Sequence, residues 1–273
     1  MHATTSYLQA AREADLLARA SGLPYVVGVS TDPLSDEQRL LVEYADPELL
    51  STDEARDTLW RALLADHHEV SALVVRAAGA VRLPPPWHRT LSYVRLTDEA
   101  GVPAAADGPR VTAAEEEHRP LVAEWLVRAI LHAAREQGQP ADLAAAAAEA
   151  DAVIDTPSRQ SLLVWEDGEP VGHATVVARS RDEVTGLSYM DLVDILVEPA
   201  ADGPAGRRAL VAAVADLARA ARLPLIGHVV HGLDGGGDRV VDALCTRGWT
   251  VDHRYWTARV EELAATLKGA RRA

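Results

Sequence analysis

The chain has 273 residues and a formal net charge of −14, and hydrophobic residues make up 48% of it. This length is sufficient for one large domain or two modest ones. The acidic balance argues against a nucleic-acid partner, because phosphates need a basic surface, and it favours a small cationic molecule over an anion. No segment approaches the roughly 20 apolar residues of a membrane span, so we expect no membrane association.

The cysteine content and the first residues predict a cytoplasmic protein. Cys245 is the single cysteine, which excludes an intrachain disulfide and agrees with a reducing compartment. Residues 1–20 carry acidic side chains within their apolar pattern and lack a basic start followed by an apolar core. They therefore do not resemble a secretory signal. The sequence leaves the oligomeric state open between a monomer and a homodimer.

The N-terminal part, residues 1–105, predicts a small α/β domain. Residues 52–65 have helical character with Thr52 as the N-cap. Residues 69–79 and 86–96 predict two strands. The stretch 96–110 is polar and acidic with small residues, Gly and Pro, which indicates a linker.

The C-terminal part, residues 109–265, predicts a larger mixed α/β domain. Its first helix is expected to begin at Thr112, with Glu115 completing a capping box. A second helix follows over residues 141–154, and Asp167-Gly168 predicts the turn of a hairpin within residues 161–178. The remaining elements are expected to alternate as a strand (189–199), a helix (206–223), a strand (224–230), a helix (238–249) and a strand (250–260).

Two aromatic-led strands suggest an internal duplication. Residues 87–96 read WHRTLSYVRL, and residues 249–260 read WTVDHRYWTARV. Each is expected to end its half of the chain after a helix and a strand. Because the match is short, chance similarity is the alternative explanation.

The segment 193–210, VDILVEPAADGPAGRRAL, joins a strand to a helix through small residues. The first amides of a helix have no intrahelical partners and lie at the positive end of the helix dipole, so a phosphate could bind there. Pro204 removes one amide donor and Asp202 would repel phosphate, whereas Arg207 and Arg208 could pair with it. The alternative is a tight strand-to-helix turn with solvated arginines.

From Arg110 to Val260 the chain resembles the GNAT superfamily of N-acetyltransferases. The resemblance is carried by Val197-Glu198-Pro199 at the end of a strand, by the loop that follows, and by Gly248-Trp249 before the last strand. The loop departs from the family pattern, which has a basic residue and three small residues. Those four positions hold Asp202, Gly203, Ala205 and Arg207, and a shift of one residue brings Gly206 into the third small position.

The resemblance implies a GNAT-like central mixed sheet flanked by helices. The two-part organisation also resembles tandem GNAT proteins, with a degenerate, shortened N-terminal half. The implied activity is transfer of an acetyl group from acetyl-CoA to a primary amine of a small molecule, by direct attack in a ternary complex. Two alternatives stay open: an acyl-CoA enzyme with altered chemistry, such as decarboxylation or transfer of another acyl group, and a non-catalytic ligand-binding relic.

The resemblance also assigns residues to acetyl-CoA. The strand 195–197 is implied to pair with the pantetheine arm through its backbone, and the loop and helix start to hold the pyrophosphate. The implied cosubstrate-binding residues are Ile195, Leu196, Val197, Gly203, Ala205, Gly206, Arg207 and Arg208.

Asp191 is the candidate catalytic base. It takes the place of a carboxylate that many members of the family use, and a carboxylate on a central strand is costly unless it is solvated, paired or functional. Such a group could relay the proton of an attacking amine. The two-residue period of a strand predicts that Asp191 shares a face with Val193, whereas Asp194 points to the other face. The alternative role is an ion pair with an arginine, such as Arg179, across the hairpin.

Cys245 is the candidate general acid, because it falls at the spacing of a tyrosine in the family. Its thiol could protonate the departing CoA thiolate, or the residue could be a buried apolar side chain. Tyr189 and Tyr255 are possible substitutes. Three histidines in or beside predicted strands could relay protons: His173, His228 and His231. Residues three apart on a strand face opposite ways, so we expect no metal site from His228, His231 and Cys245.

Overall fold

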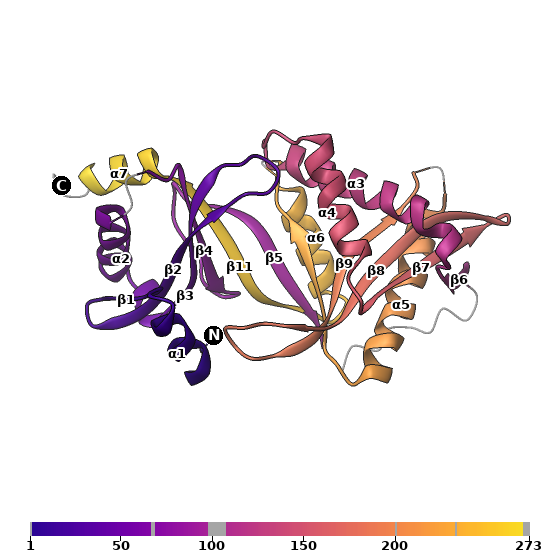
Figure 1. The fold of residues 1–273 in the computed structure, drawn as a ribbon, viewed down its shortest axis with the longest axis horizontal. Helices are drawn as coiled ribbons and strands as arrows, with labels where there is room; N and C mark the ends of the chain where they lie inside the picture. The colour runs from indigo at the N-terminus through magenta and orange to yellow at the C-terminus, as the bar shows by residue number, and fades with distance from the viewer. Residues whose placement is uncertain (1, 67–68, 98–107, 200, 233, 270–273) are drawn as a thin grey trace. The chain divides into compact units, whose positions relative to one another are not determined.

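The computed structural model describes residues 2–66, 69–97, 108–199, 201–232 and 234–269 as a mixed α/β fold (Figure 1), which confirms the predicted fold class. The chain forms two compact units. Unit 1 contains the described residues of 1–92, 182–187 and 251–273, and unit 2 contains those of 93–181 and 188–250. This division differs from a single cut between residues 105 and 109. The turn at residues 182–187 and the described chain from residue 251 onward belong to unit 1, although they follow the predicted cut in the sequence. Residues 98–107 of the expected linker lie outside the described chain.

Unit 1 contains a sheet with the order β1-β2-β3-β4-β11-β5. Two predicted strands are confirmed as β4 and β5, and the predicted helix is confirmed as α2, where the Ala55 amide donates to Thr52 Oγ1 at 3.2 Å. Its elements are α1 (Thr5–Glu13), β1 (Leu17–Ala20), β2 (Leu23–Thr31), β3 (Gln38–Ala45), η1 (Pro47–Leu50), α2 (Asp53–Asp66), β4 (Ala72–Ala78), β5 (His88–Leu96), β11 (Trp249–Arg259) and α7 (Val260–Gly269).

Unit 2 contains a sheet with the order β5-β10-β9-β8-β7-β6, and β5 and β11 contribute residues to both units. Helices α3 and α4 cover one face, where Trp125 packs with Leu163, and α5 covers the other, where Gly206 meets Val164 and Val197. Its elements are β6 (Arg110–Ala113), η2 (Glu116–His118), α3 (Arg119–Glu136), α4 (Leu143–Ile154), β7 (Arg159–Glu166), β8 (Glu169–Arg181), β9 (Ser188–Val197), α5 (Gly203–Ala221), β10 (Leu225–Val230) and α6 (Gly236–Cys245).

The predicted start of the first helix of unit 2 was wrong. Residues 110–113 form strand β6, which pairs with residues 162–165 of β7, and the Trp165 indole donates to Thr112 Oγ1 at 2.8 Å. The helix begins seven residues later, at Arg119. The Thr112 hydroxyl was expected to cap a helix, but it accepts a hydrogen bond from the Trp165 indole instead. The backbone around Thr112 forms its hydrogen bonds with β7. The cap pattern alone cannot show this competition.

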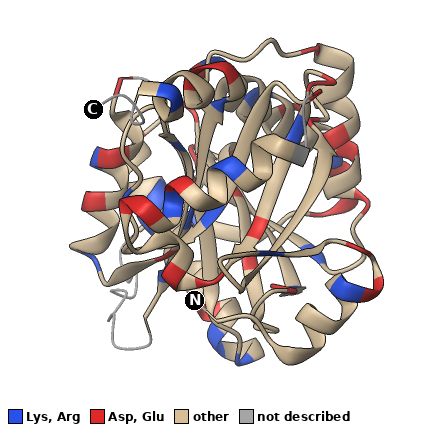
Figure 2. Ribbon diagram, turned by 90° about the vertical axis from the view of Figure 1, so that its left-hand side faces the viewer, with Lys and Arg blue, Asp and Glu red and all other residues tan. Residues whose placement is uncertain are grey.

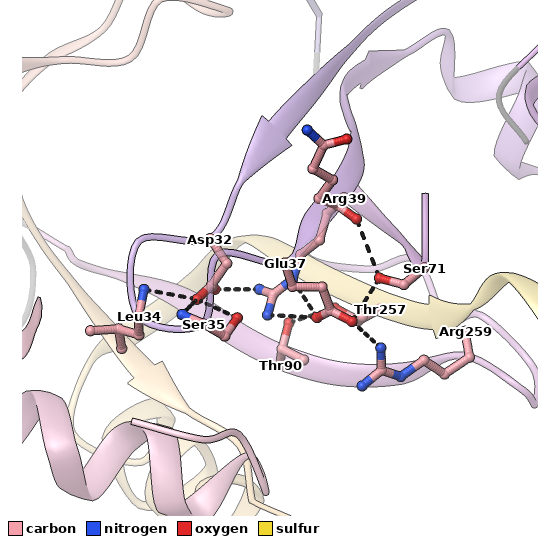
Figure 3. Close-up of polar contacts among 10 residues, drawn as sticks. Asp32, Leu34, Ser35, Glu37, Arg39, Ser71, Thr90, Thr257 and Arg259 are labelled. Carbon is pink, nitrogen blue, oxygen red and sulfur yellow. Dashed lines mark hydrogen bonds and ion pairs between the residues drawn. The ribbon is translucent and has the colours of Figure 1, made fainter. Parts of the chain in front are cut away.

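The hairpins β2–β3 and β8–β9 end in the same six-residue turn, opened by Asp32 and Asp182. In each turn the backbone N–H of the aspartate donates to the sixth residue's carbonyl, at 2.9 Å and 2.8 Å, and the fifth residue has positive φ (54° and 71°). Each aspartate side chain accepts from two backbone amides, those of Leu34 and Ser35 in the first turn (Figure 3) and of Val184 and Thr185 in the second. Figure 3 also shows Arg39, whose guanidinium pairs with Asp32 at 2.6 Å.

The strand registers that follow these turns also repeat. In β3 and β4, Leu41 pairs with Val74, and at the corresponding place in β9 and β10, Asp191 pairs with Ile226. Each hairpin also has a β-bulge, which leaves Glu43 in β3 and Val193 in β9 as the extra residue. The helices that come next are capped by residues 150 apart, Thr52 and Asp202. This repeated geometry supports an internal duplication.

The described helices include none that is long and apolar enough to cross a membrane. Figure 2 shows acidic and basic positions scattered over helices and loops, and Asp and Glu outnumber Lys and Arg by 41 to 27 in the sequence. The protein therefore carries its negative charge dispersed over helices and turns.

Candidate active site

Strands β9 and β10 diverge after a short stretch of parallel pairing. The register joins residues 190–192 to residues 225–227, although β9 continues to Val197 and β10 to Val230. On its other side, the β9 segment 194–197 pairs with β8. The β10-facing edge of residues 193–197 is therefore suited to a ligand that binds as an added strand does, through backbone hydrogen bonds. The GNAT resemblance implies contact with the pantetheine arm in this segment.

The bulge at Val193 brings two carboxylates to one face of the sheet. Asp191 pairs with Val177 and Asp194 with Thr175, and these two β8 residues are two apart and share a face. The prediction that Asp194 points away from the face of Asp191 was therefore wrong. The extra residue of a bulge shifts the alternation of side chains by one, and the residue types of this strand did not reveal it.

Asp191 carries a buried, unsatisfied carboxylate at the point where β9 and β10 diverge. Its Oδ1 atom is buried and has no hydrogen-bond partner in the described chain. Burial raises the pKa of Asp191 to about 6, and no positive charge in the described part of the chain opposes this shift. The alternative ion pair with Arg179 is thus not formed. A carboxylate of this kind is ionised at neutral pH and accepts a proton more readily than an exposed aspartate does.

Asp194 is held by a chain of buried polar groups on β8 and β7. His173 is fully buried, and its Nε2 atom lies 2.9 Å from Asp194 Oδ2. Its Nδ1 atom lies 3.0 Å from Thr175 Oγ1, which lies 2.8 Å from Ser161 Oγ. The Trp125 ring of α3 stacks on the His173 ring with centroids 5.3 Å apart. The sequence offered His173 as a proton relay but did not identify Asp194 as its partner.

The two histidines of the β10 region have different surroundings. His228 is exposed, yet desolvation by the surrounding protein lowers its pKa, while the charge of Asp194 acts in the opposite direction. Its ring lies 5.8 Å from that of Tyr93 on β5. His231 is instead buried, with Nδ1 3.2 Å from Asp238 Oδ1 on α6. Among the described residues, no group of three or more His, Cys, Asp or Glu is arranged to hold a metal ion.

The amides at the start of α5, expected to be available for phosphate, are engaged within the protein. Asp202 is the N-cap, and its carboxylate accepts from the Ala205 amide at 3.2 Å. The Gly203 amide donates to the Ala201 carbonyl at 2.7 Å, and the Gly206 amide to the Asp202 carbonyl at 2.9 Å. Pro204 has no amide hydrogen. A phosphate at this place would therefore have to displace the Asp202 side chain.

Gly206 and the two arginines have separate roles in this structure. A Cβ atom on Gly206 would lie 3.2 Å from Val197 Cγ1, so the glycine allows α5 to pack closely against β9. The Arg207 guanidinium lies 3.3 Å from where a Cβ on Gly203 would be, and both Arg207 and Arg208 are exposed. A cation at a helix N-terminus is unfavourable by itself, and a bound anion would offset this cost. The arginines are thus the predicted residues of this segment whose side chains remain able to pair with a phosphate.

Cys245 is the last residue of α6 and is exposed, so the alternative of a buried apolar cysteine was wrong. In the described chain, no hydrogen bond joins its thiol to Asp191. Tyr189 lies on β9, two residues before Asp191, and Tyr255 lies on β11 in unit 1. The assignment of the general acid to Cys245 remains a prediction.

Unit 1 provides an internal comparison for these polar residues. Its strands have a bulge at the corresponding place and similar pairing around it, but they carry different side chains there. The counterparts of Asp191, Asp194, His173 and His228 are Leu41, Tyr44, Pro24 and Arg76. Because the strand arrangement forms without the carboxylates, the fold does not require them in unit 2. Their presence there indicates a functional site.

No protein-family model and no curated protein matches this sequence. Solved structures do match the fold. An acetyltransferase of the GNAT family from Colwellia psychrerythraea is 15% identical, with 94% of this chain and 97% of that chain covered and a TM-score of 0.52. A GCN5-related N-acetyltransferase from Sphaerobacter thermophilus is 13% identical, with 87% and 76% covered and a TM-score of 0.50. The chain therefore has the fold of the GNAT-family acetyltransferases.

Proposed function

We propose that the protein is an acetyl-CoA-dependent N-acetyltransferase that acts on a primary amine of a small molecule. The observation that carries this proposal is the buried, unpartnered carboxylate of Asp191, located where β9 and β10 diverge. The GNAT fold supports acyl transfer as a class of reaction. The open edge of β9 fits a donor with amide groups along its arm, as the pantetheine of acetyl-CoA has.

The residues of unit 2 have distinct tasks in this reaction. The thioester of acetyl-CoA supplies an activated acyl group and a thiolate leaving group. The backbone of residues 193–197 orients the donor arm, and Arg207 and Arg208 neutralise its diphosphate. The ammonium group of the substrate first gives one proton to Asp191, which frees the lone pair on nitrogen. As this nitrogen bonds to the acyl carbon and the carbon–sulfur bond breaks, a second proton leaves the nitrogen to water. The thiolate takes a proton from Cys245 or from water.

The pH dependence of the transfer tests this role of Asp191. Because the base must be ionised, kcat/KM is expected to fall as the pH drops through about 6, in addition to any change caused by the amine itself. The assay quantifies acetylated amine and free CoA together, across pH 5 to 9, with a panel of small primary amines. Equal amounts of both products support the proposal. Free CoA without acetylated amine, or an acid limb at the same pH in Asp191→Asn, would contradict it.

One observation favours a second candidate function. Asp202 and Pro204 leave no free amide donor among residues 203–206 at the start of α5. This is what a ligand-binding protein that has lost its phosphate site would show. Such a protein would give neither product in the transfer assay. The Asp191 carboxylate argues against this alternative, because a buried charge without a partner is costly and has no evident structural use.

A further inference from the structure

Asp194 lies beside the proposed reaction centre and has no part in the transfer itself. It follows Asp191 on the same face of β9, at the first positions beyond the pairing with β10. His228 lies across the divergence, on β10. Desolvation lowers the pKa of His228, and the charge of Asp194 acts to raise it. The open end of the two strands therefore has a carboxylate on one side and an imidazole on the other, with Asp191 at the closed end.

The structure holds Asp194 in one orientation with one oxygen engaged. His173 Nε2 lies 2.9 Å from Asp194 Oδ2, which is an ion-pair distance, and His173 Nδ1 lies 3.0 Å from Thr175 Oγ1, with which it shares a hydrogen bond. His173 and Thr175 are both fully buried, which fixes this arrangement. The Asp194 side chain is 20% exposed, so part of it remains accessible. Asp194 is thus positioned by buried side chains of β8, at a place on β9 beyond its pairing with β10, and part of its carboxylate stays accessible.

The histidine across the divergence does not neutralise this carboxylate. Desolvation lowers the pKa of His228, so the imidazole is uncharged at neutral pH. In unit 1 the counterparts of Asp194 and His173 are Tyr44 and Pro24, and the strands form the same bulge there. A carboxylate supported by a buried histidine is therefore an addition to the fold, and it lies next to the unpartnered Asp191 Oδ1.

We propose that the substrate carries two positive groups, and that Asp194 binds the one that does not react. This inference rests on the proposed function, and it narrows the substrate to small diamines and related amines with a second cationic group. Asp191 receives the proton of the reacting nitrogen, while Asp194 makes a charge-assisted hydrogen bond to the second cation. The overall charge of −14 favours the approach of such a substrate.

The test compares a diamine with a monoamine of equal length, 1,4-diaminobutane and butylamine. Wild type is expected to have a kcat/KM about 10-fold or more higher for the diamine, from the strength of hydrogen bonds to charged groups. In Asp194→Asn this ratio is expected to fall by about 10-fold, mainly through KM. The surface variant Asp216→Asn, whose aspartate is exposed on α5, is the matched control and keeps the wild-type ratio.

A second measurement uses wild type alone, in case Asp194→Asn does not fold. Because salt screens charge pairs, the preference for the diamine is expected to decrease as ionic strength rises. An unchanged ratio in Asp194→Asn, or equal rates for both amines in wild type at low salt, would overturn the inference and leave the proposed function standing. Absence of acetylation with every amine would overturn the proposed function itself.

Discussion

Replacing Asp191 with asparagine is expected to lower the kcat of acetyl transfer at pH 7.5 by about 10²–10⁴-fold, the usual contribution of a general base. Asparagine has nearly the same shape and cannot accept the proton. The binding of acetyl-CoA should persist, because the predicted donor contacts lie on residues 193–197 and on the arginines of α5. Steady-state kinetics with a fixed amine, together with a titration of acetyl-CoA, measures both effects.

The stability of Asp191→Asn separates a catalytic from a structural role. The folded-state pKa of about 6 lies above the ordinary aspartate value of 3.8, so the ionised group costs stability as the pH rises through this range. The neutral variant is therefore expected to be at least as stable as wild type at pH 7.5. Asp216→Asn serves as the control, with unchanged kcat. Full activity of Asp191→Asn, or a loss of stability that accounts for its inactivity, would contradict the assignment.

Replacing Arg76 with methionine is expected to lower the free energy of unfolding by about 3–5 kcal/mol, the cost of leaving a buried charge without its partner. Arg76 is 3% exposed on β4 of unit 1. Its two terminal nitrogens lie 2.9 Å and 2.6 Å from the two oxygens of Asp182, in the β8–β9 turn. Because Asp182 also organises that turn, the loss should extend to its backbone. Urea denaturation at pH 7 measures the change.

The effect of Arg76→Met is expected to depend on pH. Burial alone would raise the pKa of Asp182, but hydrogen bonds from Arg76 and Thr185 outweigh it and lower the pKa to about 2. A depressed pKa contributes stability at pH values above the ordinary aspartate pKa of 3.8, and this contribution is lost as the pH falls toward 2. The difference between variant and wild type should therefore shrink in acid. Arg219→Met, which removes an exposed pair with Asp216, should change stability by less than about 0.5 kcal/mol. Equal losses of unfolding free energy in Arg76→Met and Arg219→Met would contradict this prediction, because the buried pair would then stabilise the protein no more than the exposed pair does.

The elements with clear periodic patterns were predictable from the sequence. The α2 helix, the hairpin at Asp167-Gly168 and the order of strands and helices from residue 161 onward follow from local patterns of apolar residues and turn residues. Strand β6 was not predictable in this way, because four residues with a capping pattern formed sheet hydrogen bonds instead. The outcome depends on β7, which lies about 50 residues later in the chain.

The candidate site was predictable only in part. Asp191 was identified from its place on a central strand and from the GNAT resemblance, but its neighbour Asp194 was placed on the wrong face. A bulge depends on how two strands pair, and an alternating pattern in one strand does not contain that information. The start of α5 shows the same limit. Gly206 was interpreted as a phosphate-binding residue, whereas it lies against Val197 and allows close helix packing.

The measurement that tests the account most directly is a crystal structure of the protein with acetyl-CoA. We expect the donor arm along residues 193–197, the thioester beside Asp191, and the diphosphate on Arg207 and Arg208, with the Asp202 side chain displaced from the Ala205 amide. Acetyl-CoA bound elsewhere on the protein, with that edge of β9 free and Asp202 still capping α5, would contradict the account.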